Sequence, residues 1–189
     1  MYPEDPKVSS SPRYVNEDLY IMTAIKTPDF HPLLDMLDGT DPHYPQGLNP
    51  NYRFPPKDRT LLQLAGYYGD PDKVRILLAH GADVNALDCD GDNALFIAMN
   101  IPERYHSFKI LKMLRANGTD IDHQNHKGWT VLHRACVLGN ISLVALVLSF
   151  QPDVFKLTNK NMVSYQLATV PLFYLMCLFC LWCTVLLVR

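Results

Sequence analysis

Short apolar faces separated by glycines run through the middle of the chain. One face lies in Leu61–Ala65, and a second, with i, i+3, i+4 spacing, lies in Val74–Leu78. Gly69 separates the two faces, and Gly81 follows the second where a helix C-cap requires positive φ. The pattern predicts two short helices joined by a tight turn. Neither helix can bury its apolar face alone, so the pattern also predicts a stack of such pairs.

The same pattern recurs along the chain at a nearly constant period. The equivalent alanines, spaced by 33, 37 and 33 residues, are Ala65, Ala98, Ala135 and Ala168. Four extra residues around Pro102–His106 lengthen the second interval, and we expect them between the two helices of that repeat. The predicted repeats are 58–91, 92–128, 129–160 and a partial repeat at 161–168.

These repeats resemble those of the ankyrin-repeat family. Thr130-Val-Leu-His133 resembles the threonine-proline-leucine-histidine start of that repeat, and Leu78–Asn85 resembles its end. The resemblance covers Asp58 to Ala168, although no repeat keeps the start proline and only the third keeps the histidine. It implies an all-α ankyrin-repeat solenoid, built of helix-turn-helix repeats with β-turn fingers, that binds another protein without catalysis.

The N-terminal third departs from the regular period. Residues 1–17 are rich in proline and serine, lack the apolar stretch of a secretory signal, and are expected to be flexible. In 18–57 we expect a degenerate N-terminal capping repeat followed by a proline-rich loop. The prolines between Asp38 and Lys57 block helix formation and favour an extended structural insertion. A proline-rich ligand for an SH3-like domain is the alternative.

Residues 169–189 form a hydrophobic tail. Val170 to Val188 carries no charge and is apolar on every side, and its 19 residues suffice to cross a bilayer as a helix. The tail is therefore a candidate transmembrane anchor that would leave the repeats in the cytoplasm. Because the tail interrupts the fourth repeat, a non-functional alternative terminus is the competing interpretation. Its cysteines, Cys177, Cys180 and Cys183, indicate apolar packing or palmitoylation rather than a metal site.

Charge and composition narrow the function. The chain has 17 Lys+Arg and 19 Asp+Glu, a net charge of −2, which argues against nucleic-acid binding. A hydrophobic content of 48% excludes a fully disordered chain. Phosphate-loop, dinucleotide-binding, zinc-protease and serine-hydrolase motifs are absent from the sequence. We therefore expect a non-catalytic protein without a cofactor.

Two clusters have spacings that suggest metal ligands. The histidines and cysteine with zinc-like spacing are His123, His126, His133 and Cys136. Asp88, Asp90 and Asp92 suggest a calcium loop, but the required glycine and glutamate positions hold Asn93 and Met99. Repeat positions explain both clusters better, with His133 bonded to backbone inside its repeat. A metal-dependent enzyme in the third repeat remains the less favoured alternative.

The resemblance implies that partners contact the fingers and the adjacent helix ends. The corresponding positions are Lys57, Arg59, Tyr67, Tyr68, Cys89, Asp90, Asp92, His126, Lys127, Trp129, Val137 and Leu138. Exposed aromatic residues are favoured interface anchors, which singles out Tyr67, Tyr68 and Trp129. Asn85 resembles the asparagine hydroxylated in many ankyrin repeats, although a purely structural role of its amide is preferred.

The function expected on these grounds is that of a protein-interaction module, serving as a membrane-tethered adaptor or scaffold. An alternative within the binding proteins is a substrate receptor, for example of a ubiquitin ligase. That role would require a recruitment box after the repeats, which this sequence lacks.

Overall fold

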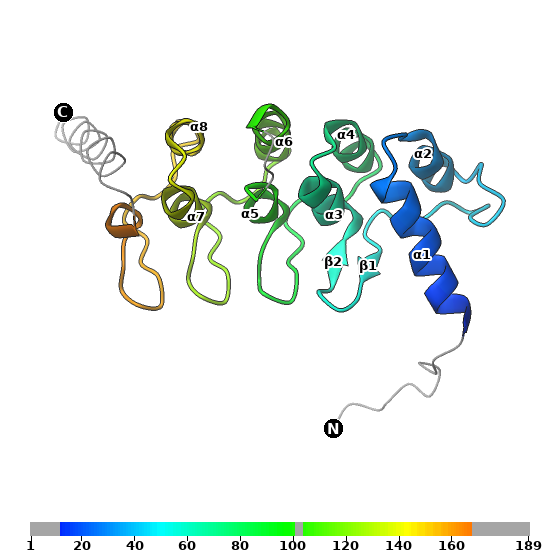
Figure 1. Cartoon of the computed structure of the whole chain (residues 1–189), viewed down its shortest axis with the longest axis horizontal. Coiled ribbons are helices and arrows are strands. Elements are labelled where there is room, and N and C mark those ends of the chain that lie inside the picture. The colour runs from blue at the N-terminus through cyan, green and yellow to red at the C-terminus, as the bar shows by residue number, and fades with distance from the viewer. Residues whose placement is uncertain (1–11, 101–103, 168–189) are drawn as a thin grey trace, which may run out of the picture. The chain divides into compact units, whose positions relative to one another are not determined.

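The computed structural model describes residues 12–100 and 104–167 (Figure 1). The chain divides into two compact units, Met1–Asn49 and Pro50–Arg189. No helix within the described residues is long and apolar enough to cross a membrane. The candidate anchor at 170–188 lies outside the described residues.

The first unit is a pair of helices, α1 (Pro12–Lys26) and α2 (His31–Asp38). Ile21 of α1 and Leu33 and Met36 of α2 are fully buried. Helix α1 begins at Pro12, within the segment 1–17 for which we expected flexibility. Proline is well tolerated in the first turn of a helix, where its missing N–H has no intrahelical acceptor.

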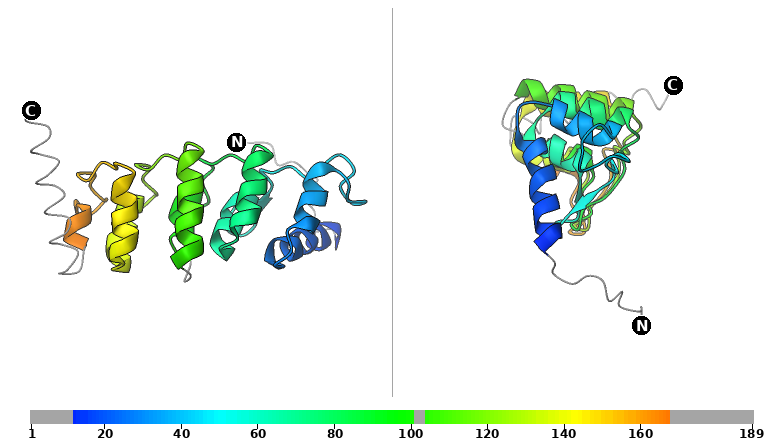
Figure 2. Two further views of the ribbon diagram at one scale, coloured as in Figure 1. Left: turned by 90° about the horizontal axis from the view of Figure 1, so that it is seen from above. Right: turned by 90° about the vertical axis from the view of Figure 1, so that its right-hand side faces the viewer.

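The second unit contains the stacked helix pairs that the period predicts. The inner helices are α3 (Leu61–Tyr68), α5 (Ala94–Ala98), α7 (Val131–Leu138) and the 3-10 helix η1 (Ser164–Leu167). The outer helices are α4 (Pro71–Ala79), α6 (Arg104–Ala116) and α8 (Ile141–Ser149). Figures 1 and 2 show the two rows, with the finger loops projecting from the side of the inner helices.

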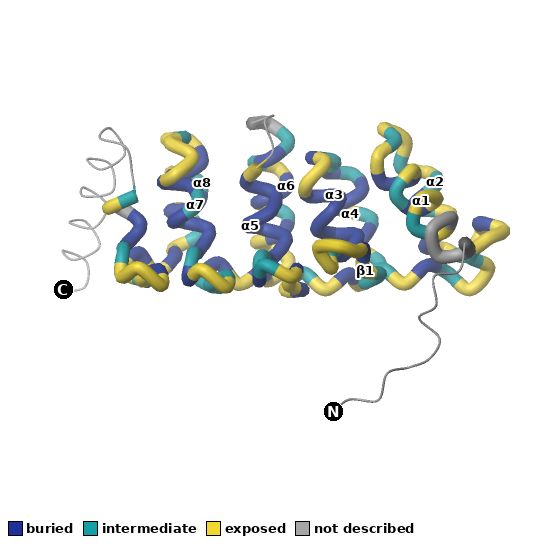
Figure 3. The backbone as a smooth tube through the Cα atoms, turned by 60° about the horizontal axis from the view of Figure 1, so that its bottom comes forward, coloured by how far each residue is buried: buried dark blue, intermediate teal, exposed yellow. Residues whose placement is uncertain are grey.

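Contacts of each inner helix with the next inner helix and with its own outer helix form the core of this unit. Leu61, Leu95 and Leu132 are completely buried, as are Ala65, Ala98 and Ala135, the three described alanines among the four that mark the period. Figure 3 shows the buried positions along the inner sides of the helices and the exposed positions at the finger tips. The small alanines let neighbouring helices approach closely, so each repeat completes the core of the next.

Side-chain caps fix where the inner helices begin. Thr60 and Thr130 each form a capping box with the residue three positions later, Gln63 and His133 respectively. The Asn93 side chain accepts from the backbone N–H of Phe96 in the shorter helix α5. These bonds satisfy N–H groups that a helix start leaves without a partner, so each finger leads into its helix in a defined way.

Two local features differ from the sequence expectations. Helix α6 has 13 residues, whereas α4 and α8 have 9 each, so at least part of the four-residue insertion lengthens the outer helix instead of forming a loop. Part of the proline-rich segment pairs as a short antiparallel hairpin, β1 (Arg53–Phe54) with β2 (Arg59–Thr60). The sequence analysis did not predict this hairpin, because strands of only two residues leave almost no alternating pattern in a proline-rich segment.

Candidate functional site

Each finger is a tight turn closed by its own backbone. The first finger is the β1–β2 hairpin, and the others span 88–92, 125–129 and 158–162. The first residue of each of these three donates its N–H to the carbonyl of the last, at 3.0, 3.1 and 3.0 Å. In each of these turns, the side-chain oxygen of the first residue also accepts two backbone N–H groups of the same turn. These first residues are Asp88, Asn125 and Thr158. The fingers are therefore defined in shape before any partner is considered.

Neighbouring fingers are joined by one backbone hydrogen bond each. The N–H groups of Cys89, His126 and Asn159 donate to the carbonyls of Lys57, Asp90 and Lys127, at 3.0, 3.1 and 3.2 Å. We call this series the finger ladder. It fixes the spacing of the finger side chains along the stack.

A second series of bonds links the repeats through side chains. Asn51, Asn85 and Asp122 each accept a backbone N–H from the next repeat, from Asp83, Asp120 and Asp153, at 2.7 to 2.9 Å. The Asn85 amide also donates to the carbonyl of Gly118 at 3.3 Å. Both polar atoms of the amide are thus bonded, which supports the structural role expected for Asn85. Hydroxylation of Asn85 stays a prediction.

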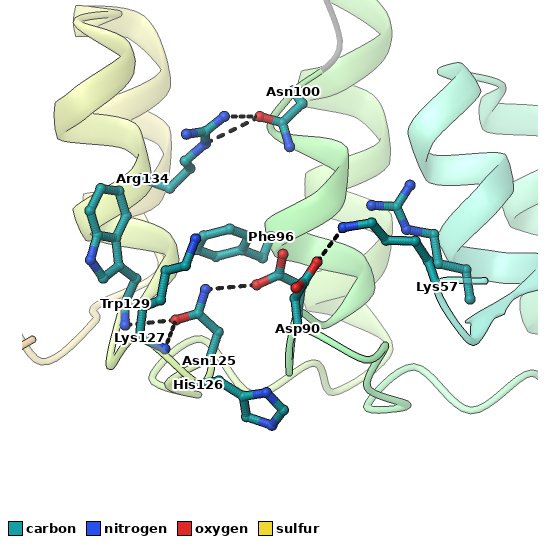
Figure 4. Close-up of a pocket in the computed structure, with 11 residues that line it drawn as sticks. Lys57, Asp90, Phe96, Asn100, Asn125, His126, Lys127, Trp129 and Arg134 are labelled. Carbon is teal, nitrogen blue, oxygen red and sulfur yellow. Dashed lines mark hydrogen bonds and ion pairs between the residues drawn. The ribbon is translucent and has the colours of Figure 1, made fainter. Parts of the chain in front are cut away.

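A groove of about 350 Å³ lies between the fingers and the inner helices of the first three repeats (Figure 4). Seven of the twelve predicted partner-binding residues line it: Lys57, Arg59, Asp90, Asp92, His126, Lys127 and Trp129. The sequence analysis missed four further lining residues, namely Phe96, Asn100, Asn125 and Arg134.

The five remaining predicted residues lie outside this groove. Tyr67 and Tyr68 are partly exposed at the end of α3 and meet edge to face, with ring centroids 5.3 Å apart. The Arg59 guanidinium carbon lies 5.2 Å from the centroid of the Tyr67 ring, which connects this pair to the groove. Val137 and Leu138 are exposed at the end of α7, and Cys89 is exposed on the second finger.

Ion pairs neutralise one side of the groove. Lys57 Nζ lies 2.6 Å from Asp90 Oδ2, and this hydrogen bond lowers the pKa of Asp90 and raises that of Lys57. Arg59 Nε lies 3.3 Å from the fully buried Asp88 Oδ2. Burial raises the pKa of Asp92, although the Asn125 amide donates to its carboxylate at 2.8 Å. On this side, then, every cation has a carboxylate partner.

The opposite side carries cations without such partners. Figure 4 shows Arg134, Trp129 and Lys127 along it, facing Lys57 and Asp90 across the groove. Arg134 donates through Nε and an Nη to Oδ1 of Asn100, a neutral acceptor. Within the described residues, no carboxylate forms an ion pair with Arg134 or Lys127. The groove therefore has an excess of positive charge at its Trp129 side.

Phe96 supplies the apolar surface of the groove, and its position in the repeat explains why. Gln63, at the equivalent position, donates to the carbonyls of Ala86 and Asp92 at 2.9 and 3.0 Å. His133 likewise reaches the Met162 carbonyl at 3.2 Å. Phe96 cannot make such a bond. In its repeat, the Asn93 amide donates to the Asp120 carbonyl and the Asn125 amide donates to the Asp92 carboxylate.

Two of the three histidines with zinc-like spacing, His123 and His133, are occupied by structural contacts, whereas His126 lines the groove. Nδ1 of the fully buried His133 accepts the Thr130 backbone N–H at 3.2 Å and lies 2.8 Å from the Thr130 hydroxyl. Its Nε2–H then faces the Met162 carbonyl, and burial lowers its pKa, so the ring is neutral. His123 Nε2 lies 2.8 Å from the Gly91 carbonyl. The expected backbone-bonding role of His133 is confirmed.

The acidic cluster on the second finger is also accounted for by local bonds. Carboxylate oxygens of Asp88, Asp90 and Asp92 lie within 4.8 Å of one another. Asp88 holds its own finger and Arg59, Asp90 pairs with Lys57, and Asp92 accepts from Asn125. Each carboxylate thus accepts a hydrogen bond from another group of the protein, although only Asp88 and Asp90 have a cationic partner among the described residues.

Comparison with known proteins agrees with this architecture. The stacked helix pairs and ladder-linked fingers define a solenoid repeat protein. Family models described as "Ankyrin repeats (many copies)" and "Ankyrin repeat" match residues 102–161 and 57–89. The chain belongs to the ankyrin-repeat family. Proteins with such repeats act as protein–protein interaction modules.

The similar proteins are otherwise diverse. The ankyrin repeat protein YahD of Escherichia coli is 31% identical over 91 residues, 48% of this chain and 43% of YahD. Human Inversin is 26% identical over 95 residues, 49% of this chain and 9% of Inversin. The ARF GTPase-activating protein Git of Drosophila melanogaster is 43% identical over 53 residues, 28% of this chain and 7% of Git. The chain thus matches less than half the length of each relative.

The contribution of finger contact to stability can be measured with two glycines. Gly128 and Gly81 both have positive φ, 74° and 80°. A Cβ on Gly128 would lie 2.6 Å from the Asn159 backbone N, whereas a Cβ on Gly81 meets nothing within 4 Å. In chemical denaturation, Gly128→Ala should lose about 2 kcal/mol more free energy of unfolding than Gly81→Ala, because only Gly128→Ala adds overlap to backbone strain. Equal losses would contradict this role of the ladder.

The neutral state of His133 predicts a pH dependence of stability. Its folded-state pKa is lowered, so the unfolded chain binds the proton more readily and stability falls as the pH drops through about 6.5. His133→Gln, which copies the Gln63 arrangement, should flatten the free energy of unfolding between about pH 7 and pH 5. The reciprocal control, Gln63→His, should steepen it. An unchanged slope in His133→Gln would show that His133 is not the titrating group.

Proposed function

We propose that this chain binds a partner protein through the groove and the inner-helix residues beside it, as a non-catalytic adaptor or scaffold. The supporting observation is that finger and helix residues from three repeats meet in one groove, with aromatic side chains and charged groups interspersed. Large aromatic anchors beside arginine are the composition favoured at the energetic centres of interfaces.

The surrounding contacts suit this surface for binding. The finger ladder and the caps hold the backbone of the lining residues, so little conformational entropy is lost when a partner binds. Tyr67 and Tyr68 extend the aromatic surface toward the first repeat. The alternative of a metal-dependent enzyme has less support, since His133 is buried and both of its ring nitrogens face groups of the protein itself.

Proximity labelling in cells, read by quantitative mass spectrometry, tests the proposal. Trp129→Ala and Arg134→Ala should each reduce labelling of a shared set of proteins about fivefold or more, since truncating a central anchor typically costs over about 1 kcal/mol. Phe155→Ala is the aromatic control, because Phe155 is 58% exposed and lies outside the groove. Lys112→Ala on outer helix α6 is the control for charge.

The controls separate a binding surface from a general loss of folding. The controls should keep the full set of labelled proteins, and all variants should be present at the level of the unchanged chain. Labelling that is indifferent to Trp129 and Arg134 would overturn the proposed surface.

The membrane-tethered form of this function is supported by the sequence alone. Val170 to Val188 offers 19 uncharged residues, within the length that spans a bilayer, and lies outside the described residues. A tether there would display the fingers at a membrane surface and raise the local concentration of membrane-bound partners.

Alkaline-carbonate extraction of the full chain from cells tests the tether. The chain should remain in the membrane pellet, and Leu178→Arg combined with Leu181→Arg should release it, because each central arginine costs about 3 kcal/mol of insertion. The matched control, Phe155→Arg combined with Leu157→Arg, adds the same charge at exposed positions of the repeats and should stay in the pellet. Extraction of the unchanged chain into the supernatant would reject the anchor.

A further inference from the structure

The third finger separates two grooves. His126, Lys127 and Trp129 line the groove described above and also a second groove of about 570 Å³. The second groove is completed by residues of the fourth finger and η1, namely Thr158, Asn159, Lys160, Met162 and Leu167. A ligand lying over Trp129 would therefore reach both.

The finger tips carry charges in a defined order. The residues that precede the positive-φ position of the four fingers are Lys57, Asp90, Lys127 and Lys160. The first two neutralise each other at 2.6 Å. Lys127 and Lys160 carry like charges on neighbouring fingers, and both side chains are exposed. Neither forms an ion pair with a described residue.

Among the described residues, no carboxylate lines the second groove. Its lining combines two lysines and a histidine with the apolar surface of Trp129, Met162 and Leu167. On the other side of Trp129, Arg134 donates two of its five N–H groups to Asn100, and no further acceptor for it is found within residues 12–100 and 104–167. The surroundings of Trp129 thus present unneutralised cations around an apolar surface.

We propose that the surface around Trp129 binds an extended protein segment in which acidic side chains flank an apolar one. The apolar side chain packs against Trp129, and the carboxylates pair with Lys127, Lys160 and Arg134. This inference rests on the proposed function and specifies its partner. Charge complementarity supports it, because carboxylates can pair with Lys127 and Lys160, which form no ion pair within the described part of the chain.

The same cations do not form a long basic track. Asp90 and Asp92 border them on the second finger, and Asp90 already holds Lys57. A nucleic-acid backbone or an anionic lipid surface would extend over these carboxylates, whereas a short acidic segment can lie over Trp129, between Lys160 and Lys127 on one side and Arg134 on the other. The observations therefore favour a peptide segment over the larger polyanions.

Selection of a phage-displayed library of random peptides on the purified full chain tests the inference. Sequencing should show aspartate and glutamate enriched about threefold or more beside an apolar residue. The double variant Lys127→Glu with Lys160→Glu should lose that enrichment and select basic peptides instead, because the local charge is inverted. A chosen acidic peptide should bind the double variant about tenfold more weakly, and its affinity for the unchanged chain should fall with salt.

Lys109→Glu combined with Lys112→Glu is the matched control. It makes the same change in net charge at exposed positions of outer helix α6. This variant should select the same acidic peptides as the unchanged chain. If it also lost them, net charge rather than the Trp129 surface would govern binding, and the inference would be overturned.

The outcomes distinguish this inference from the proposed function. Selected peptides without acidic bias, whose binding still fails in Trp129→Ala, would overturn the acidic partner and leave the binding surface standing. Peptide binding indifferent to Trp129→Ala and to the double variant would count against both. Tighter binding of a single-stranded oligonucleotide or of phosphatidylserine vesicles than of any selected peptide would also overturn the acidic segment.

Discussion

Packing of each inner helix against the next is the interaction on which this structure depends. Helices of five to eight residues are too short to be stable alone, and their buried leucines and alanines need the outer helix of the same repeat and the inner helix of the next. The caps fix where each helix begins, and the finger ladder fixes the spacing of the fingers, so successive repeats stack in a defined register. The groove is a product of that register, since its lining residues come from three repeats and would not meet in any one of them.

The site shows how a repeat protein separates stability from recognition. Positions that face the next inner helix are filled by small or branched apolar residues, whereas finger-tip positions vary from lysine to aspartate at no cost to the core. Phe96 stands between these two classes. It occupies a place where Gln63 and His133 join repeats through hydrogen bonds, and it gives the groove an apolar surface instead.

Periodicity predicted the helix pairs and most of the finger residues because both follow from spacing along the chain. It could not predict Arg134 or Asn125 as groove residues, since their roles depend on contacts with Asn100 and Asp92, which are distant along the chain. The β1–β2 hairpin and the early start of α1 were not predicted from the sequence for a different reason. Two-residue strands and a proline-led first turn leave almost no periodic signal in the sequence.

The lengthened helix α6 shows where this architecture tolerates change. Four residues more than in α4 or α8 are taken up by the outer row, yet the bonds that cross that repeat, from His126 to Asp90 and from Asp120 to Asn85, keep ordinary lengths. The 33-residue period is therefore a requirement of the fingers and inner helices only. The start of the outer helix is a natural insertion point, where a reporter or a second binding element could be grafted while the recognition surface keeps its spacing.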